Sequence, residues 1–175
     1  PKGVGALVIR RGRKLHELMP GGGQERGRRS GTENVPGIAG FAAVLGELDY
    51  TCCAKIRTLF EHMLREAIPE VRILGDDAER LANTSMFCLP GMDGETLLMQ
   101  LDLADFAVAS GSACSSGKRD PSHVLLAMGV AQELARGSIR VSFGPASSDD
   151  DARALVEELL RIHQRLKTMA GMAAR

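Results

Sequence analysis

Apolar residues recur at helical spacing along two stretches of this chain. One begins at Val35 and resumes over residues 56–64, and the other covers residues 155–166. Because side chains three and four positions apart share one face of a helix, both stretches predict amphipathic helices. The first pattern fits either one long helix or two in succession, and Pro69 ends it. The second helix is expected to start at the acidic run 149–151, which suits the positive end of a helix dipole.

Shorter apolar runs predict strands. These runs cover residues 7–10, 71–74, 84–89, 106–109 and 138–143. Glycine or proline lies close to the ends of each run, as is typical of strands. In the last run, strict alternation places Ile139, Val141 and Phe143 on one face of the strand and Arg140 on the other.

The chain is expected to divide into an incomplete opening section, residues 1–40, and a second part, residues 41–175. The second part predicts an α+β unit in which about three antiparallel strands are backed by helices. Short helices over residues 95–103 and 122–128 belong to it. The opening section starts almost at once with a strand, so we expect its sheet to be completed by residues upstream in a longer protein. A strand edge without a partner promotes aggregation.

Cys114 lies in a run with little apolar surface to bury it, SGSACSSG at residues 110–117. Buried cysteines act as small apolar side chains, whereas nucleophilic cysteines need solvent access and surroundings that favour the thiolate. We therefore predict that Cys114 is reactive. Lys118 and Arg119 follow the run and would favour the thiolate if they fold back toward it.

The other three cysteines, Cys52, Cys53 and Cys88, lie in segments that resemble a helix or a strand, and we expect all three to be buried. Their spacing fits neither a zinc motif nor a disulfide framework, which favours a reducing compartment. Lysine plus arginine number 22, as do aspartate plus glutamate, and no apolar run is long enough to cross a bilayer. The composition thus predicts a cytoplasmic globular protein without nucleic-acid or membrane partners.

Two further segments could bind a ligand. Residues 21–32 are rich in glycine and arginine, and they form either a solvated linker or an anion cradle in which the Thr32 hydroxyl donates to a phosphate oxygen. Arg140 is either a solvent-facing strand residue or a residue that holds a carboxylate through two parallel hydrogen bonds. The residues alone leave these alternatives open.

Five segments together resemble the cysteine desulfurases of the NifS/IscS type, which belong to the class V aminotransferase-like family. The segments are PKGVGAL (1–7), GGGQERGRRSGTENVPG (21–37), SGSACSSG (110–117), PSHVL (121–125) and SIRVSFG (138–144). They follow the family's order and cover the chain nearly end to end. The resemblance implies an α/β fold, the C-terminal part of a fold type I pyridoxal-phosphate enzyme. Residues 1–40 would end the large-domain sheet, and residues 41–175 would form a connecting helix and an α+β small domain with a short antiparallel sheet packed on helices.

The resemblance also implies a reaction. In this family pyridoxal 5'-phosphate activates free L-cysteine, a loop cysteine attacks the substrate sulfur, and the products are alanine and an enzyme persulfide. Cys114 matches that nucleophile, and Arg140 matches the arginine that binds the substrate carboxylate. Thr32 matches a threonine that contacts the cofactor phosphate of the neighbouring subunit, which implies a homodimer with shared active sites.

The resemblance names partners as well. The serine- and glycine-rich setting of Cys114 is similar to that of family members with a long mobile cysteine loop, which pass sulfur to an iron-sulfur scaffold or another acceptor protein. In such members this cysteine can serve briefly as an iron-sulfur ligand, so Cys114 is also the candidate metal-binding residue.

The cofactor-binding lysine of the family would lie upstream of Pro1. Lys2 matches a second lysine of the same motif, which does not bind the cofactor in this family. We therefore expect this chain alone to be inactive. Two alternatives stay open: a persulfide carrier or dimerisation module without pyridoxal phosphate, and an anion- or nucleic-acid-binding protein. The latter would use Arg26, Arg28 and Arg29, which have no aromatic neighbours for base stacking.

The histidines do not add to the predicted site. His123 lies nine positions from Cys114 but near the start of a predicted helix, so we expect a solvated residue rather than a base. His16, His62 and His163 are scattered along the sequence and receive no role.

Overall fold

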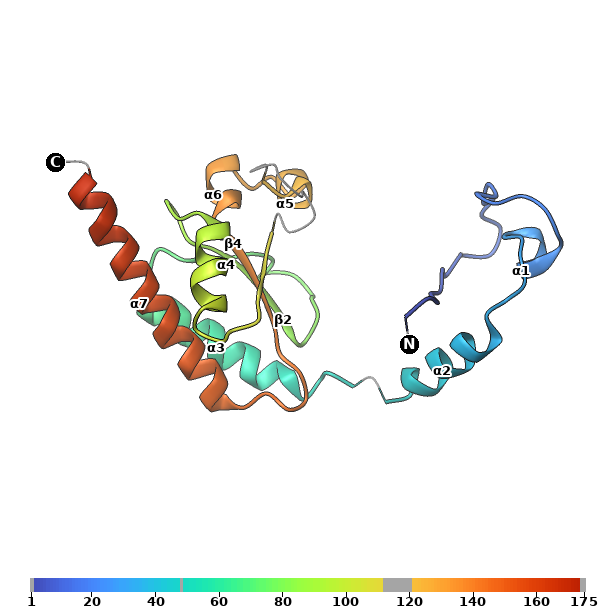
Figure 1. Cartoon of the computed structure of the whole chain (residues 1–175), viewed down its shortest axis with the longest axis horizontal. Helices are drawn as coiled ribbons and strands as arrows, with labels where there is room; N and C mark the ends of the chain where they lie inside the picture. Colours follow the sequence, from blue (N-terminus) through green and yellow to red (C-terminus); the bar gives the residue numbers. More distant parts are fainter. Residues whose placement is uncertain (1, 48, 112–120, 174–175) are drawn as a thin grey trace. The chain divides into compact units, whose positions relative to one another are not determined.

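The structure is a computed structural model that describes residues 2–47, 49–111 and 121–173. The chain forms two compact units, Pro1–Asp49 and Tyr50–Arg175 (Figure 1).

The first unit contains a short helical turn, α1 (Gln24–Gly27), and one regular helix, α2 (Val35–Leu45). The Asn34 side chain caps α2 by accepting a hydrogen bond from the Gly37 amide at 3.1 Å. The strand predicted over residues 7–10 is wrong, because these residues form no strand and Val8 is 96% exposed. A strand needs a hydrogen-bonded neighbour, and none of the described residues supplies one to this segment.

The second unit is built on a four-stranded antiparallel sheet in the order β1-β2-β4-β3. The strands are β1 (Arg72–Ile73), β2 (Thr84–Cys88), β3 (Ala109–Ser110) and β4 (Ser138–Ser142). Each of the four apolar runs predicted between residues 71 and 143 contributes one strand to this sheet, for which about three antiparallel strands were expected. The strand expected over residues 106–109 is shifted, because only its last residue pairs with β4.

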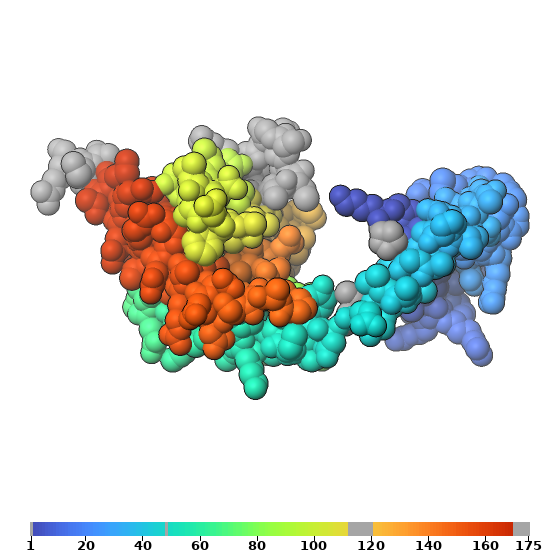
Figure 2. Space-filling model, turned by 60° about the horizontal axis from the view of Figure 1, so that its bottom comes forward, coloured from blue at the N-terminus to red at the C-terminus, as the bar shows by residue number. Residues whose placement is uncertain are grey.

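The described residues of this unit form five helices. They are α3 (Cys53–Ala67), α4 (Gly94–Asp102), α5 (His123–Ala127), α6 (Gln132–Arg136) and α7 (Asp149–Ala173). The first helical pattern thus forms two separate helices, α2 and α3. Figure 2 shows α7, orange to red, with α3 along one side and α4 along the other. The sequence analysis did not predict α6, because its five residues are too few to display a helical repeat and its N-cap, Ala131, gives no helix-start signal.

Three phenylalanine rings form the centre of the core. Phe60 of α3 lies 5.9 Å from Phe87 of β2 and 5.6 Å from Phe143, measured between ring centroids. All three side chains are buried, together with Ile139 and Val141 of β4. The alternation predicted for residues 138–143 is therefore confirmed, and these apolar side chains join the sheet to α3 and α7.

An ion pair between a partly buried arginine and a buried glutamate adds to this core. The Arg80 guanidinium donates two hydrogen bonds, of 2.6 and 2.8 Å, to the carboxylate of Glu61 on α3. Burial raises the pKa of Glu61, but the hydrogen bonds and the positive charge of Arg80 outweigh it, so the pKa lies below its ordinary value. The folded state therefore holds this carboxylate ionised.

Replacing Arg80 by methionine is expected to lower the free energy of unfolding by about 2 kcal/mol at neutral pH, because Glu61 stays buried without its partner. The unfolded chain protonates Glu61 at a higher pH than the folded chain does. The stabilisation is therefore present above pH 4.5, the ordinary pKa, and is lost as the pH falls through the lower folded pKa. The free energies of unfolding of the parent protein and of Arg80→Met should therefore become similar at low pH. Urea denaturation of both proteins at several pH values measures this difference.

Arg65 provides the matched control for this prediction. Its ion pair with Asp76 is equally short, 2.6 Å, but both side chains are nearly half exposed. Arg65→Met is therefore expected to cost less than about 1 kcal/mol at any pH. Equal losses of unfolding free energy from the Arg65 and Arg80 substitutions would contradict the larger stabilisation expected from the Arg80–Glu61 pair.

Candidate active site

Arg140 lies in the middle of β4, on the sheet face opposite the phenylalanine core. The burial of β4 alternates around it, so that Ile139 and Val141 are buried while Arg140 is exposed. Its register neighbours are Met86 on β2 and Ala109 on β3. The sequence analysis predicted this orientation from the alternation alone, and the structure confirms it.

The surroundings of Arg140 leave its guanidinium available to a ligand. Within the described residues it has no ion pair with a carboxylate. The next register pair on the same face brings the Thr84 and Ser142 hydroxyl oxygens to 3.5 Å from each other. A planar guanidinium beside small hydroxyl groups suits a carboxylate, which it can bind through two parallel hydrogen bonds.

The segment that carries Cys114 leaves the sheet next to this strand. Ala109 lies opposite Arg140, Ser110 lies opposite Ile139, and the Gly111 amide donates to the Ser138 carbonyl at 3.2 Å. A Cβ atom at position 111 would meet the Ser138 hydroxyl and lie 3.2 Å from the Ser138 Cβ, so a larger residue here would force the Ser138 side chain to move. Cys114 itself lies outside the described residues, and its predicted reactivity stays a prediction.

Thr32 belongs to the first unit, where it is exposed between the glycine-rich loop and α2. The loop closes on itself, since the Ser30 amide donates to the Met19 carbonyl at 3.0 Å. A Cβ atom at Gly21 would lie 2.9 Å from the Ser30 Cβ, so this closure needs glycine. A backbone cradle beside a threonine hydroxyl has the chemistry of a phosphate site. The predicted residues Thr32 and Arg140 belong to different units and are not brought together within one of them.

Two pockets of the described residues are large enough to consider, and neither is lined by Thr32 or Arg140. A pocket of about 770 Å³ in the first unit is lined in part by Arg28, Arg29 and Glu33. The arginines therefore face a cavity that also holds acidic side chains, rather than a purely basic surface.

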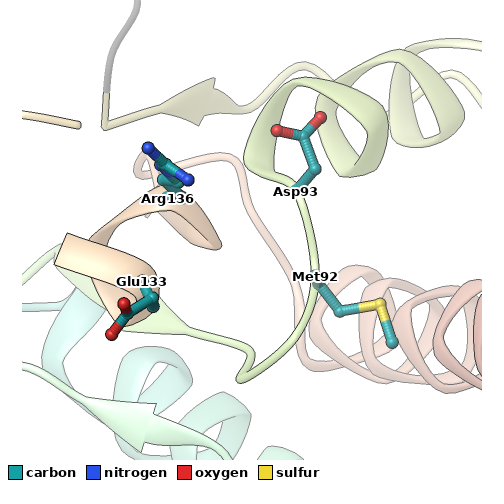
Figure 3. Close-up of a pocket in the computed structure, with 4 residues that line it drawn as sticks. All are labelled: Met92, Asp93, Glu133 and Arg136. Carbon is teal, nitrogen blue, oxygen red and sulfur yellow. The ribbon is translucent and has the colours of Figure 1, made fainter. Parts of the chain in front are cut away.

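The second pocket, of about 350 Å³, lies between the start of α4 and the short helix α6. Figure 3 shows Met92 and Asp93 on the side of α4, and Glu133 and Arg136 on the side of α6. Asp93 already caps α4 by accepting from the Thr96 amide and hydroxyl at 2.9 and 2.8 Å. The sequence analysis missed this pocket because α6 was not predicted.

The cysteines outside the loop differ in exposure. Cys53 and Cys88 are buried, as predicted, and burial raises the pKa of Cys88 to about 11, which keeps it a thiol. The predicted burial of Cys52 is wrong, because this residue is exposed. It is the N-cap of α3 and so precedes the residues that share the buried face of that helix.

The histidines agree with the sequence analysis where it made a prediction. His123 is exposed at the first position of α5. His163 is a buried residue of α7, with its ring nitrogen 3.3 Å from a Glu70 oxygen. Burial lowers its pKa, so it is neutral at physiological pH.

Comparison with known proteins gives consistent matches. A sequence profile of the family described as aminotransferase class V matches residues 1–155. A protein of Gluconacetobacter diazotrophicus named cysteine desulfurase is 42% identical over 97% of this chain. A protein of Dictyoglomus turgidum named cysteine desulfurase IscS is 40% identical over 97% of it. The chain spans less than half the length of these two relatives, 44% and 45%.

The fold matches as well. The crystal structure of a NifS-like protein from Rickettsia africae superposes with a TM-score of 0.69 at 33% sequence identity, covering 87% of this chain and 41% of the other. The predicted α/β class, with a short antiparallel sheet packed on helices, is therefore confirmed. Among the helices that the structure describes, none combines the length and apolar character needed to cross a bilayer.

Proposed function

Because this chain belongs to the aminotransferase class-V family, we propose that it carries the sulfur-accepting and carboxylate-binding residues of a pyridoxal-phosphate-dependent cysteine desulfurase. The observation that carries the proposal is the register of β3 and β4. It sets Ala109, at the entry to the cysteine segment, directly beside Arg140. A sulfur acceptor and a carboxylate-binding group would thus serve one amino-acid substrate. The names of the relatives support the same assignment.

Arg140 would bind the carboxylate of L-cysteine. Its position on a central strand restricts the backbone, and its exposure on the face away from the core leaves the guanidinium accessible. Two parallel hydrogen bonds fix the plane of a carboxylate as well as its position. The substrate would therefore be held in one orientation relative to the cysteine segment.

Cys114 would accept the sulfur. Its thiolate attacks the substrate sulfur, a sulfur–sulfur bond forms, and the bond between the substrate sulfur and Cβ breaks with its electron pair left on carbon. A proton on that carbon completes alanine, and Cys114 becomes a persulfide. The atoms of L-cysteine and one thiol are thus fully accounted for in alanine and the persulfide.

Thr32 and the closed glycine loop would hold the phosphate of pyridoxal 5'-phosphate in the neighbouring subunit of a homodimer. When bound, this cofactor supplies the electron sink that weakens the bond to the substrate sulfur. The exposed Thr32 hydroxyl is suited to donate a hydrogen bond to a phosphate oxygen.

The wider assignment follows from the same proposal. The first unit would complete the cofactor-binding large domain, and the second unit would be the small domain that carries the cysteine segment. The persulfide sulfur would pass in the cytoplasm to an iron-sulfur scaffold or another acceptor protein, and Cys114 would be able to ligate the cluster briefly. The chain alone would not turn over, because the cofactor-binding lysine is proposed to lie upstream of Pro1.

The carboxylate site is tested by substitution of Arg140 in the cofactor-loaded protein that contains this chain. Arg140→Lys keeps the charge but loses the paired hydrogen bonds, and it is expected to raise KM for L-cysteine about tenfold or more. Arg140→Gln is expected to raise KM further, since it loses the charge too. Initial rates of alanine formation over a range of L-cysteine concentrations measure both effects.

Arg72→Gln is the control, because Arg72 is an exposed arginine on the edge strand β1, which does not pair with β4. It is expected to change KM less than about twofold. A normal KM in Arg140→Gln would refute the proposed role of Arg140.

A further inference from the structure

Two sulfur atoms lie in contact at the start of α3. The Sγ atoms of Cys52 and Cys53 are 3.8 Å apart. Cys52 is exposed at the N-cap of the helix, and Cys53 is only 2% exposed and forms part of the core. The pair therefore has one sulfur that solvent reaches and one that packing holds in place. Nothing in the proposed desulfurase reaction uses these residues.

The distance between the sulfur atoms fits a shared metal ion. Zinc–sulfur bonds of about 2.3 Å that meet at a tetrahedral angle place two sulfur atoms about 3.8 Å apart. This equals the separation of 3.8 Å in the structure. The two thiols thus have the spacing of two ligands of one tetrahedral ion without any movement of the backbone.

A disulfide between the same residues fits less well. A sulfur–sulfur bond is about 2.05 Å long, so the two Sγ atoms would have to approach much closer. The Cα atoms of neighbouring residues are about 3.8 Å apart, which is below the range of about 4.4–6.8 Å found in disulfides. The geometry therefore disfavours a disulfide and leaves the two thiols in a hydrogen-bond contact, which a shared ion would replace.

We propose that Cys52 and Cys53 bind a thiophilic divalent cation such as Zn²⁺ as a pair of thiolates. Sulfur ligands select such cations over magnesium or calcium. Binding releases two thiol protons, and two thiolates with one divalent ion carry no net charge. The complex therefore adds no net charge at the start of α3.

The other ligands of the ion are not proposed to come from a preformed cluster of side chains in the described part of the chain. No group of three or more histidine, cysteine, aspartate or glutamate side chains with the spacing of a metal site occurs among the described residues. Water or a donor from another molecule completes the four ligands. The site is consequently weaker than a closed structural zinc site with four protein ligands.

Cadmium is the probe, because its bonds to thiolates produce an ultraviolet charge-transfer band that counts the sulfur ligands. The titration uses the protein that contains this chain with Cys114→Ser, which removes the other cysteine predicted to be reactive. We expect one Cd²⁺ per chain, a band of the intensity of two thiolates, and the release of two protons. Zn²⁺ added afterwards should compete for the site, whereas Mg²⁺ should not.

Cys52→Ser is the decisive variant, because serine is a preferred N-cap residue and α3 therefore keeps its start. It is expected to weaken Cd²⁺ binding at least about tenfold and to reduce the band to one thiolate or less. Cys53→Ala should do the same, while Cys88→Ala should leave the titration unchanged. Unchanged Cd²⁺ binding in Cys52→Ser, or a one-thiolate band in the parent protein, would overturn the proposal.

Discussion

Cys114→Ala is expected to abolish sulfur transfer from L-cysteine in the cofactor-loaded protein, lowering the rate of alanine formation about a thousandfold or more. Alanine has no sulfur to attack the substrate, and no other group takes its place. The variant should retain the visible absorption of its bound pyridoxal phosphate, since the cofactor is held by other residues. Alanine formation and the absorption spectrum, measured on the same preparation, separate loss of chemistry from loss of cofactor.

Ser115→Ala is the matched control, because it alters the neighbouring residue of the same segment and leaves the thiol in place. It is expected to retain most of the activity. Substantial turnover by Cys114→Ala would show that another group accepts the sulfur. Loss of the cofactor band in that variant would instead assign Cys114 to cofactor binding.

Phe60→Ala is expected to have the largest effect on stability, a loss of about 4 kcal/mol of unfolding free energy. Phe60 is completely buried and its ring meets both Phe87 and Phe143, so its removal opens a cavity at the centre of the core. Urea denaturation followed by circular dichroism measures the difference.

Two further variants make this prediction falsifiable even if Phe60→Ala fails to fold. Phe60→Leu keeps most of the apolar volume and should lose clearly less stability than Phe60→Ala. Leu103→Ala removes an apolar side chain that is 79% exposed and should change stability by less than about 0.5 kcal/mol. Similar losses at positions 60 and 103 would contradict the assignment of the core.

The second unit was largely predictable because its pattern reflects burial within the unit itself. The helical repeat predicted α7, and the alternation of residues 138–143 predicted that Arg140 lies opposite the core. The length of β1 and the existence of α6 were not predictable, because β1 has only two residues and the N-cap of α6, Ala131, gives no helix-start signal.

The wrong predictions share a physical cause: a sequence pattern does not show which residues lie next to a segment in the folded chain. Residues 7–10 have the composition of a strand, yet the described chain supplies no strand to pair with them. Cys52 is the same type of residue as its buried neighbour Cys53, and only its place at the N-cap of α3 explains its exposure. For the same reason the contact between the two sulfur atoms was visible only in the structure.

The candidate site was predictable in part. The orientation of Arg140 followed from alternation, but its proximity to the cysteine segment required the register of β3 and β4. Thr32 was assigned from its motif, and the structure adds that the loop before it closes around Gly21. The role of Cys114 still rests on its sequence setting and on the family resemblance.

The most direct test follows labelled sulfur from substrate to protein. The cofactor-loaded protein that contains this chain is given L-cysteine carrying a heavy sulfur isotope, quenched during turnover, digested without reduction and analysed by mass spectrometry. We predict one additional heavy sulfur atom on the peptide that contains Cys114, in an amount that falls in Arg140→Gln at limiting L-cysteine. Heavy sulfur on Cys52, Cys53 or Cys88 with none on Cys114, or alanine formed without any labelled peptide, would contradict the account.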